Sequence, residues 1–359
     1  SIILSSFLRL YIVIIAIDLT PLHGRKWTGV ELYGIDLYRA LLKTKHTIVP
    51  IFHGFNDLDD NSRSIIIPLS NRIVLENFKL SMVIRKLKAD IVLFPIFPPP
   101  IDIYINSPSK IVPVIHDTAF IDHYSTLKFA AKYYLTPKYK LALRKSSYIV
   151  TISGDAKLKI ERYSSLPILN WKENISYEYG VDNLDISKSH LSKMGLEENS
   201  YYISVSTIEP RKNLKYLLKS IRKELELSNK KLILVGRRGW GKDNELNNLL
   251  EEMSEKVIFT GYIPLNIMQS LYHYAYAFVL LSVEEGFGRT PLEAIACGCK
   301  RIIVSDIPVF HEILHNSANY IELNNEVKAE DRFIKNMWLE VRNDFHVPFD
   351  DLEKNMIFL

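Results

Sequence analysis

Cysteine is scarce in this chain of 359 residues, which contains only Cys297 and Cys299. Two cysteines one residue apart offer no disulfide framework and no C-x-x-C pair, so we expect a reducing, cytoplasmic setting in which both thiols are apolar fillers of the core. Groups of His, Cys and Glu at metal-ligand spacing are also missing, and the sequence therefore predicts neither a metal site nor a cofactor.

Two signatures of nucleotide-dependent enzymes are weak or missing. Asp57-Leu58-Asp59 has the D-x-D pattern of a metal–nucleotide site, but it lies in the polar segment FNDLDDNS, where a solvated turn is the better interpretation. Gly24 and Gly29 stand too far apart for the fingerprint G-x-G-x-x-G, and no acid stands at the distance that binds a ribose. A nicotinamide-dependent enzyme is disfavoured, although Gly29 remains a candidate for contact with a phosphate.

The chain lacks both long hydrophobic runs and a large excess of charge of one sign. The run SIILSSFLRLYIVIIAIDL is interrupted by Arg9 and closed by Asp18, and it is short for a membrane-spanning helix. We expect YIVIIAIDL to be a buried first strand, with a signal anchor as the alternative. The net charge of +4 suits a phosphate site or an anionic membrane surface, but it is too small to argue for nucleic acid.

Acidic residues are absent from the segment between Tyr124 and Gly154. The helix predicted at 127–145 mixes cations with aromatic side chains, which is typical of a helix that lies on a membrane surface. A solvated face above an ordinary core stripe explains the pattern equally well. The cations are Lys128, Lys132, Lys138, Lys140, Arg144 and Lys145, and the aromatic residues are Phe129, Tyr133, Tyr134 and Tyr139.

Strands and helices alternate along the chain, and the alternation starts again after Tyr179-Gly180-Val181-Asp182. This pattern predicts two successive Rossmann-like α/β domains, 1–180 and 181–340, whose parallel sheets face each other across a cleft. Ligands of such sheets bind at the carboxyl ends of the strands. The predicted strands are 12–17, 47–52, 91–94, 111–115, 148–152, 201–206, 231–235, 257–260, 275–281 and 301–304, and the predicted helices are 30–42, 75–88, 127–145, 214–226, 243–253, 265–272, 291–297 and 309–314.

The most informative segment is EEGFGRTPLEAIACG, from Glu284 to Gly298. It follows the apolar run AYAFVLLS, which is typical of a buried parallel strand. Gly286 and Gly288 permit a tight turn with exposed N–H groups, while Thr290 suits an N-cap and Pro291 the first helical position. The segment therefore predicts a helix N-terminus that favours anions.

The acids Glu285 and Glu293 stand eight positions apart across this turn. They are candidates for ligand binding. Alternatively, Thr290-x-x-Glu293 is a capping box in which Glu293 satisfies backbone donors, and Glu285 is an ordinary loop acid.

A cationic pair follows another predicted strand. Arg211 and Lys212 stand beside a helix N-terminus that Asn213 can cap. This arrangement suits a diphosphate, because arginine offers a bidentate fork and lysine a point charge. Two solvated loop cations are the alternative. The glycine loop LVGRRGWG adds Arg237 and Arg238 at the same edge of the sheet.

Two further strand ends carry candidates for ligand contact. In IFTGYIP, backbone amides near Ile263 can read a nucleobase edge and Tyr262 can lie against it, with a structural aromatic residue as the alternative. The apolar strand IVPVI ends in His116-Asp117, a polar pair that we expect to face the cleft. His116 can bond a substrate hydroxyl or a developing charge, with Asp117 setting its tautomer.

Together these motifs resemble the retaining glycosyltransferases of family 4, which have the GT-B fold. The resemblance covers nearly the whole chain and is most specific in its second half. The motifs that carry it are EPRKN (209–213), GRRGWG, FTGYIP, EGFGRTPLEAIACG and IIVSDIPVFHE (302–312), with IDLTPL, VPVIHD and TISGDAK as looser matches in the first half.

The resemblance implies a metal-independent transferase that moves a sugar from a nucleotide-diphosphate sugar, with GDP-mannose as the first guess, to a glycan or lipid-linked glycan. It implies that Glu293 binds the ribose, that Glu285 and the loop amides after it hold the donor sugar, and that Arg211 and Lys212 clamp the diphosphate. The candidate catalytic residues are His116, Arg211, Lys212 and Glu285, and the candidate donor-binding residues are Gly29, Ser206, Arg238, Tyr262, Ile263, Gly286, Phe287, Gly288, Arg289, Thr290 and Glu293.

The chain departs from the family pattern at two places. Ser206 stands where many members carry an arginine, so the cationic clamp would lean on Arg211, Lys212 and Arg238. The segment 341–359 is short, and we expect it to cross back to the first, acceptor-side domain. The alternatives to a transferase are a sugar-nucleotide epimerase of the same architecture and a non-catalytic paralogue that binds nucleotide sugars. We expect a cytoplasmic protein, with a peripheral position on the inner face of the membrane as a further expectation.

Overall fold

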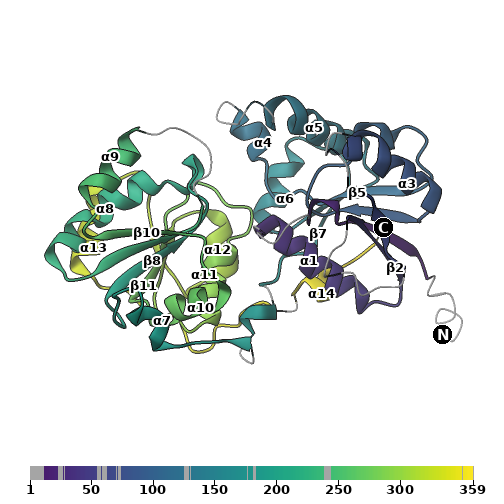
Figure 1. Ribbon diagram of the computed structural model, residues 1–359. Helices are drawn as coiled ribbons and strands as arrows, with labels where there is room; N and C mark the ends of the chain where they lie inside the picture. Colours follow the sequence, from purple (N-terminus) through teal and green to yellow (C-terminus); the bar gives the residue numbers. More distant parts are fainter. Residues whose placement is uncertain are drawn as a thin grey trace, which may run out of the picture. The chain divides into compact units, whose positions relative to one another are not determined.

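The computed structural model describes residues 12–22, 27, 29–54, 58, 63–69, 71, 74–124, 129, 131–175, 177–180, 183–237, 244–349 and 351–358. The chain divides into two compact units, each built on its own parallel sheet (Figure 1). Unit 1 consists of the described residues within 1–152, 157–172 and 350–359, and unit 2 of those within 153–156 and 173–349. The expected pair of Rossmann-like α/β domains is confirmed.

The sheet of unit 1 runs in the order β3-β2-β1-β4-β5, and all of its strand pairs are parallel. Ile15, Ala16 and Ile17 of the central strand are fully buried, because helices cover both faces of such a sheet. The strands are β1 (Ile14–Asp18), β2 (Thr47–His53), β3 (Ile65–Ile67), β4 (Ile91–Phe94) and β5 (Lys110–Pro113), and a bridge from Val114 to Val150 leads to the parallel pair β6 (Ile149–Thr151) and β7 (Ile168–Asn170).

Helical segments connect these strands, since a parallel neighbour cannot be reached by a hairpin. α6 begins within unit 2 and continues into unit 1. The segments are η1 (Thr20–Leu22), α1 (Gly29–Leu42), η2 (Leu75–Lys79), α3 (Leu80–Leu87), η3 (Ile101–Tyr104), α4 (Ala119–Asp122), η5 (Ala131–Leu135), α5 (Thr136–Lys145), α6 (Gly154–Glu161) and α14 (Asp351–Asn355).

The sheet of unit 2 runs in the order β10-β9-β8-β11-β12-β13, again with parallel pairs throughout. The strands are β8 (Tyr201–Val205), β9 (Lys231–Val235), β10 (Val257–Gly261), β11 (Ala277–Leu280), β12 (Ile302–Ser305) and β13 (Asn319–Ile321). The helices are η6 (Tyr177–Tyr179), α7 (Lys188–Ser192), η8 (Pro210–Lys212), α8 (Leu214–Leu227), α9 (Asn244–Glu252), α10 (Leu265–Tyr274), α11 (Arg289–Ala296), α12 (Pro308–Leu314) and α13 (Glu326–Lys335).

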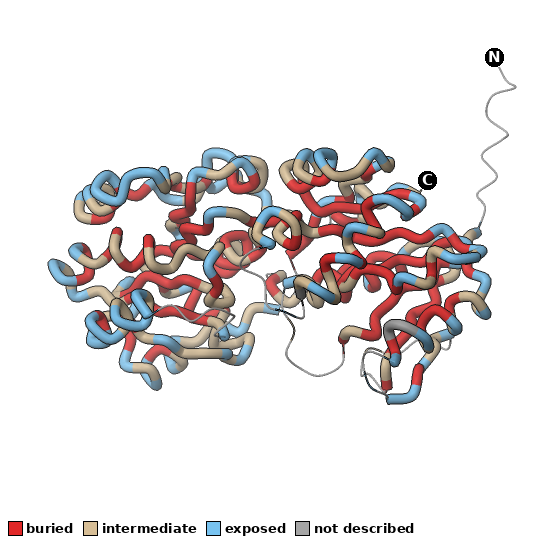
Figure 2. The backbone as a smooth tube through the Cα atoms, turned by 90° about the horizontal axis from the view of Figure 1, so that it is seen from above, coloured by how far each residue is buried: buried red, intermediate tan, exposed pale blue. Residues whose placement is uncertain are grey.

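Burial follows the periodicity of the sequence. The central strands are buried along their length, while the helices alternate between buried and exposed positions (Figure 2). α8 buries Leu217, Ile221 and Leu225, which are spaced four apart and so form one apolar face toward the core of unit 2. The two cysteines are buried in the same unit.

Residues 173–180 lie with unit 2, whereas the sequence pattern placed them in the first domain. Gln269, buried in α10, donates a hydrogen bond to the Glu178 carbonyl and accepts one from Asp185 N, both at 2.9 Å. These bonds fasten the segment to α10. The domain boundary therefore lies before Glu173, and no pattern in the sequence marks it.

Several other elements differ from the expected ones. The helices expected at 75–88 and 127–145 each contain a π-helical segment, η2 and η5, before the α-helix continues. The strands β3, β7 and β13 were not predicted, because three-residue strands are too short to show a period. Within the N-terminal apolar run, 14–17 form a strand as expected. Within the described residues, no helix is long and apolar enough to cross a membrane.

Candidate functional site

The candidate residues of unit 2 gather at the carboxyl edge of its sheet. η8 follows β8 and carries Arg211 and Lys212, while the loop after β11 carries Glu285 and leads into α11. A hydrogen bond from Val283 N to the Arg211 carbonyl (2.9 Å) joins the two loops. The loops meet because β8 and β11 are neighbours in the sheet, and the carboxyl ends of parallel strands share one edge.

Lys212 and Glu285 form a buried ion pair at this edge. Lys212 Nζ lies 2.6 Å from Oε1 and 2.8 Å from Oε2 of Glu285. Ser282 Oγ donates a hydrogen bond to Oε1 (2.7 Å), and Arg211 Nη1 lies 3.6 Å from Oε2. Arg211 Nε in turn donates to the carboxylate of Glu209. Glu285 is therefore held by two cations and a hydroxyl, which is not the environment of an ordinary loop acid.

Burial and neighbouring charge shift the pKa values of this ion pair in opposite directions. Burial by itself would raise the pKa of Glu285, but the charges of Lys212 and Arg211 and the hydrogen bonds from Lys212 and Ser282 leave the pKa below its ordinary value of 4.5. Burial lowers the pKa of Lys212, and the charge of Glu285 opposes that effect. Glu285 is consequently a carboxylate at neutral pH.

A second buried cluster lies at the start of α11. Arg289 Nη1 lies 2.8 Å from Glu173 Oε1, and Arg289 Nε lies 3.6 Å from Oε1 of Glu293. Tyr272 of α10 donates to Glu293 Oε2 at 3.4 Å. The three charged side chains are 4 to 7 % exposed. The guanidinium that was predicted to contact the donor is thus shared by two carboxylates.

The ionisation of Glu293 depends on these neighbours. Burial raises the pKa of Glu293, and the charge of Arg289 and hydrogen bonds from Tyr272 and Tyr179 oppose that rise. Burial also raises the pKa of Tyr179 and Tyr272, and the charge of Glu293 adds to the effect. Both phenols therefore remain protonated donors beside the Glu293 carboxylate.

The capping-box interpretation of Glu293 is wrong, because α11 begins earlier than expected. Gly288 is the N-cap and Arg289 the first helical residue, so Thr290 lies inside the helix and Glu293 beyond its first turn. Gly288 has a φ of 101°, and a Cβ added there would lie 2.7 Å from Cε1 of Phe310. Glycine is required at this position, and Thr290 is not the cap.

The expected cap of α8 is wrong as well. Asn213 occupies the N-cap position with a φ of 54°, and its side chain makes no capping hydrogen bond. Its N–H donates instead to the Pro210 carbonyl (3.0 Å), so it closes the short helix that carries Arg211 and Lys212. The residue shapes the cationic loop more than it caps the helix after it.

The neighbouring strand ends hold further candidates. Ser206 N donates to the Val235 carbonyl (3.0 Å), and Gly236, with a φ of 143°, lies so close that an added Cβ would be 2.0 Å from the Ser206 carbonyl oxygen. Tyr262 is 61 % exposed after β10, and Ile263 is half-buried. The candidates Arg238, Asp57 and Asp59 lie outside the described residues.

The remaining donor-site candidates lie in both units. Phe287 and Gly286 are buried, and the Gly286 carbonyl accepts a hydrogen bond from Ser153 Oγ (2.7 Å). Gly29 is the first residue of α1 in unit 1. Within the part of the chain that the structure describes, no three His, Cys, Asp or Glu side chains are grouped so that they could hold a metal ion.

His116 lies in unit 1, just beyond the carboxyl end of β5. Its Nε2 is 2.8 Å from the carbonyl oxygen of Pro95, and its ring makes an edge-to-face contact with Tyr33 at a centroid distance of 5.0 Å. Because a carbonyl oxygen can only accept, the proton of the neutral ring is on Nε2. Asp117 Oδ1 accepts from Ala119 N (3.1 Å). The Pro95 carbonyl therefore sets the tautomer of His116, a role that the sequence assigned to Asp117.

Three residues of these clusters were missed from the sequence. Glu209 was part of the motif EPRKN without a role, and Ser282 was read only as the end of a strand. Glu173 stands in WKENISYE, a segment with no periodicity and no motif. A contact between Glu173 and Arg289 is visible only once the fold brings them together.

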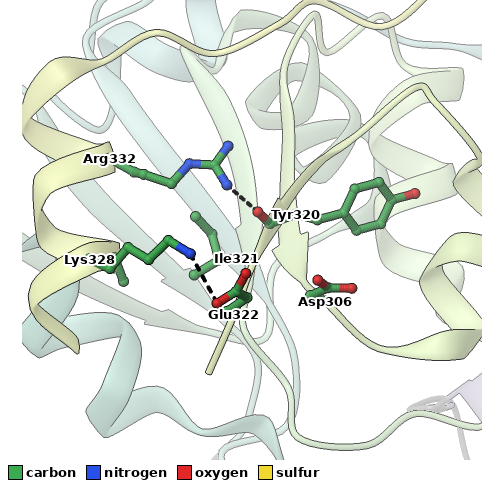
Figure 3. Close-up of a pocket in the computed structure, with 7 residues that line it drawn as sticks. Asp306, Tyr320, Ile321, Glu322, Lys328 and Arg332 are labelled. Atoms are coloured by element: carbon green, nitrogen blue, oxygen red, sulfur yellow. Dashed lines mark hydrogen bonds and ion pairs between the residues drawn. The ribbon is translucent and has the colours of Figure 1, made fainter. Parts of the chain in front are cut away.

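A small pocket of about 50 Å³ lies near the ends of β12 and β13, away from these clusters in sequence. Figure 3 shows Lys328 and Arg332 of α13 reaching toward β13, where Lys328 Nζ lies 3.0 Å from Glu322 Oε2 and Arg332 donates to the Tyr320 carbonyl. Asp306 also lines the pocket. Two carboxylates and two cations line the pocket, so its charges are balanced and do not favour a phosphate.

Comparison with known proteins finds a family match in the second half of the chain. Residues 188–337 match the family described as glycosyl transferases group 1. The chain is 32% identical over 209 residues to the O-antigen chain mannosyltransferase RfbU of Salmonella typhimurium, which covers 58% of this chain and 56% of the relative. It is 30% identical over 196 residues to O-antigen chain mannosyltransferase B of Escherichia coli, covering 52% and 50%. The chain spans about half the length of these curated relatives.

Solved structures extend the likeness to the whole chain at the level of the fold. Anabaena Alr3699/HepE, crystallised with UDP and glucose, superposes with a TM-score of 0.65 at 14% identity and covers 96% of this chain and 93% of its own. WaaG, a glycosyltransferase involved in lipopolysaccharide biosynthesis, gives 0.65 at 15% identity, with 90% of each chain covered. The chain therefore has the two-domain GT-B fold, and its residues 188–337 are similar to the glycosyl transferases group 1.

Proposed function

We propose that the protein is a retaining, metal-independent glycosyltransferase of family 4, which transfers a sugar from a nucleotide-diphosphate sugar to a glycan or lipid-linked glycan. One observation carries the proposal. Arg211, Lys212 and Glu285 converge at the carboxyl edge of a parallel sheet, within the segment that matches the group 1 glycosyltransferases. This is the edge at which doubly wound sheets bind nucleotides.

Arg211 and Lys212 are the groups suited to stabilise the leaving diphosphate. The diphosphate gains negative charge as the glycosidic bond breaks, and preorganised cations lower the energy of that state without first rearranging. Both cations are already paired with carboxylates, so the phosphates of the donor would share Lys212 with Glu285. The N–H groups at the start of α11 add a favourable dipole.

The acids and His116 supply hydrogen bonds to the sugars of the donor. Glu293 is assigned to the ribose hydroxyls and Glu285 to the hydroxyls of the transferred sugar. His116, whose Nε2 proton is directed to the Pro95 carbonyl, is assigned to a hydroxyl of the transferred sugar. No carboxylate is assigned as a nucleophile, which agrees with front-face attack and retention.

GDP-mannose is the proposed donor, because two curated relatives are named as mannosyltransferases. UDP-sugars are the competing class, since HepE was crystallised with UDP and glucose. Melting the protein with UDP, GDP and their sugars separates the two. A ligand at a hundred times its Kd stabilises by about 2.7 kcal/mol. The proposal expects a shift with guanine nucleotides, and no shift with any nucleotide would contradict a donor site.

The reaction type is tested on the product. With the correct donor, the protein should release a nucleoside diphosphate and form a glycoside of the same anomeric configuration as the donor, as seen by NMR. Turnover should persist in EDTA, because Arg211 and Lys212 take the place of a metal. Loss of turnover in EDTA that Mn²⁺ restores would contradict metal independence, and epimerised nucleotide sugar without transfer would favour the epimerase.

A further inference from the structure

Glu173 and Arg289 form an ion pair that the proposed function does not use. The carboxylate and the guanidinium are 2.8 Å apart, and their side chains are 4 % and 6 % exposed. A buried ion pair is a poor source of stability, because removing two charges from water costs about as much as their attraction returns. Its place beside Glu293, the assigned ribose-binding residue, suggests a role in that site.

The Arg289 guanidinium lies between two carboxylates and closer to one of them. Its distance to Glu173 is 2.8 Å, whereas its nearest approach to Glu293 is 3.6 Å. Arg289 and Glu293 are four residues apart on α11, a spacing at which an arginine and a glutamate readily pair. A guanidinium that closed fully on Glu293 would occupy both carboxylate oxygens in a bidentate pair. Together with Tyr272, which already donates to Oε2, the guanidinium would then fill most of the lone-pair sites at which the oxygens could accept hydrogen bonds from a ribose.

We propose that Glu173 is a positioning residue of the nucleotide site: it holds the Arg289 guanidinium away from Glu293 and so keeps the Glu293 carboxylate open to the ribose hydroxyls. The inference rests on the proposed role of Glu293. Glu173 is also the first residue of unit 2 after the chain leaves unit 1 at Lys172. The position of Arg289 is therefore tied to the segment by which the chain enters unit 2.

The charged and titratable groups around Glu293 determine the direction in which each substitution changes nucleotide affinity. Arg289 faces it from α11 and Tyr272 from α10, Tyr179 faces it from η6, and Cys297 lies further along α11. Glu173→Gln releases Arg289 to close on Glu293, which blocks the acceptor at every pH at which Glu293 is ionised. Arg289→Met removes the guanidinium that faces both Glu173 and Glu293, so the pKa of Glu293 rises and nucleotide affinity falls as the pH is lowered.

The test is a calorimetric titration of the full chain with GDP and UDP over a range of pH. Glu173→Gln should weaken binding of the preferred nucleotide about tenfold, within the range known for residues coupled in one polar network. The double variant Glu173→Gln/Arg289→Met should bind more tightly than Glu173→Gln, because it also lacks the guanidinium that blocks Glu293. A purely structural ion pair would not give this recovery.

Glu224→Gln is the matched control. Glu224 is a buried carboxylate of the same unit that pairs with Lys230 at 3.2 Å. Its loss should lower the melting temperature without changing nucleotide affinity. Melting of every variant, followed in parallel, separates lost affinity from lost folding.

Failure of the inference differs from failure of the proposed function. Unchanged affinity in Glu293→Gln would overturn the ribose assignment itself. Weaker binding in Glu293→Gln with normal or tighter binding in Glu173→Gln would overturn only the positioning role, as would a double variant that binds no better than Glu173→Gln. If Glu173→Gln does not fold, the double variant should still bind more tightly than Arg289→Met, since it has one buried carboxylate fewer beside Glu293. Equal or weaker binding there would also overturn the inference.

Discussion

Gly288 is the residue at which the glycine loop turns into α11, and its backbone geometry predicts the effect of a single methyl group. Its φ of 101° is strained for any other residue, and an added Cβ would lie 2.7 Å from Cε1 of Phe310. Gly288→Ala should lower the free energy of unfolding in urea by about 1–3 kcal/mol. Gly195→Ala is the control, because Gly195 has a φ of 64° with no neighbouring atom within 4 Å. An equal loss in both variants would show that the contact with Phe310 is unimportant.

The pKa of Glu285 predicts how the stability of the protein depends on pH. Its pKa in the folded protein is depressed, chiefly because the charges of Lys212 and Arg211 outweigh its burial. A depressed pKa contributes stability that is present above the ordinary value of 4.5 and is lost as the pH falls through the folded value. Glu285→Gln, which leaves Lys212 buried without its partner, should cost about 3–5 kcal/mol at neutral pH.

Urea unfolding of Glu285→Gln at a series of pH values checks this. The difference in the free energy of unfolding between Glu285→Gln and the unmodified protein should shrink as the pH falls below 4.5. The reason is that the Glu285 carboxylate, which stabilises Lys212, becomes protonated there. A difference that stays constant across this range would mean that the charge of Glu285 does not stabilise the loop. Ser282→Ala, which removes only the hydroxyl donor, should cost far less at neutral pH.

The site residues differ in how far the sequence could predict them. Arg211, Lys212 and Glu285 were predicted because glycine and proline mark the ends of strands, and strand ends share an edge. Their mutual pairing was not predicted, because side-chain geometry across two loops leaves no pattern in the chain. Glu173 was missed for the same reason, and the capping box failed because a glycine in the left-handed region can begin a helix without a polar cap.

At the scale of elements, α5 and η5 belong to the helix that the sequence predicted to lie either on a membrane surface or with a solvated face above the core. Phe129 and Tyr133 are 78 % and 64 % exposed, their ring centroids lie 4.5 Å apart with the rings tilted, and the helix after them exposes basic side chains. Lys138, which the sequence counted among the surface cations, is buried with its ammonium 3.9 Å from the Tyr134 ring centroid. The face is therefore smaller than predicted, but it remains both aromatic and cationic.

Charge reversal at Lys140, Arg144 and Lys145 tests this face. Each cation near an anionic surface contributes about 1 kcal/mol of attraction, so the triple glutamate variant should lose most of its co-sedimentation with vesicles that contain an anionic lipid. Reversal of the exposed unit 2 lysines 193, 300 and 335 leaves the aromatic face intact and should have less effect. Equal losses in both variants would indicate attraction by net charge alone, and binding that does not respond to salt would contradict the proposal.

The sequence predicted the long elements well and the short ones poorly. β4 and β9 begin and end at the expected residues, because their apolar runs are bounded by polar or turn-forming residues. α13 was missed because its apolar side chains, such as Ala329 and Phe333, are few among charged ones. The π-helical segments η2 and η5 shift the helical register, which a 3.6-residue period does not reveal.

At the scale of the whole molecule, the proposed reaction needs residues from both units. Arg211 and Lys212 lie in unit 2 and His116 in unit 1. His116→Ala should therefore reduce turnover far more than it reduces affinity for the nucleoside diphosphate. Single-turnover rates and calorimetry on the same preparation measure the two effects. Near-normal transfer in this variant would contradict the role assigned to His116.

The path of the chain between the units limits how the protein can be taken apart or recombined. Unit 2 includes 153–156, from which Gly154 and Asp155 N–H groups donate to Glu312 at 2.7 and 3.0 Å, as well as 173–180. A fragment that starts at 183 would leave Glu312 without these donors and Arg289 without Glu173. In a hybrid enzyme joined to a relative at one point near 180, Gly154, Asp155 and Glu173 would come from one parent. Their partners Glu312 and Arg289 would come from the other parent. Donor specificity should therefore transfer between relatives only when 153–156 and 173–180 move together with the second half of the chain.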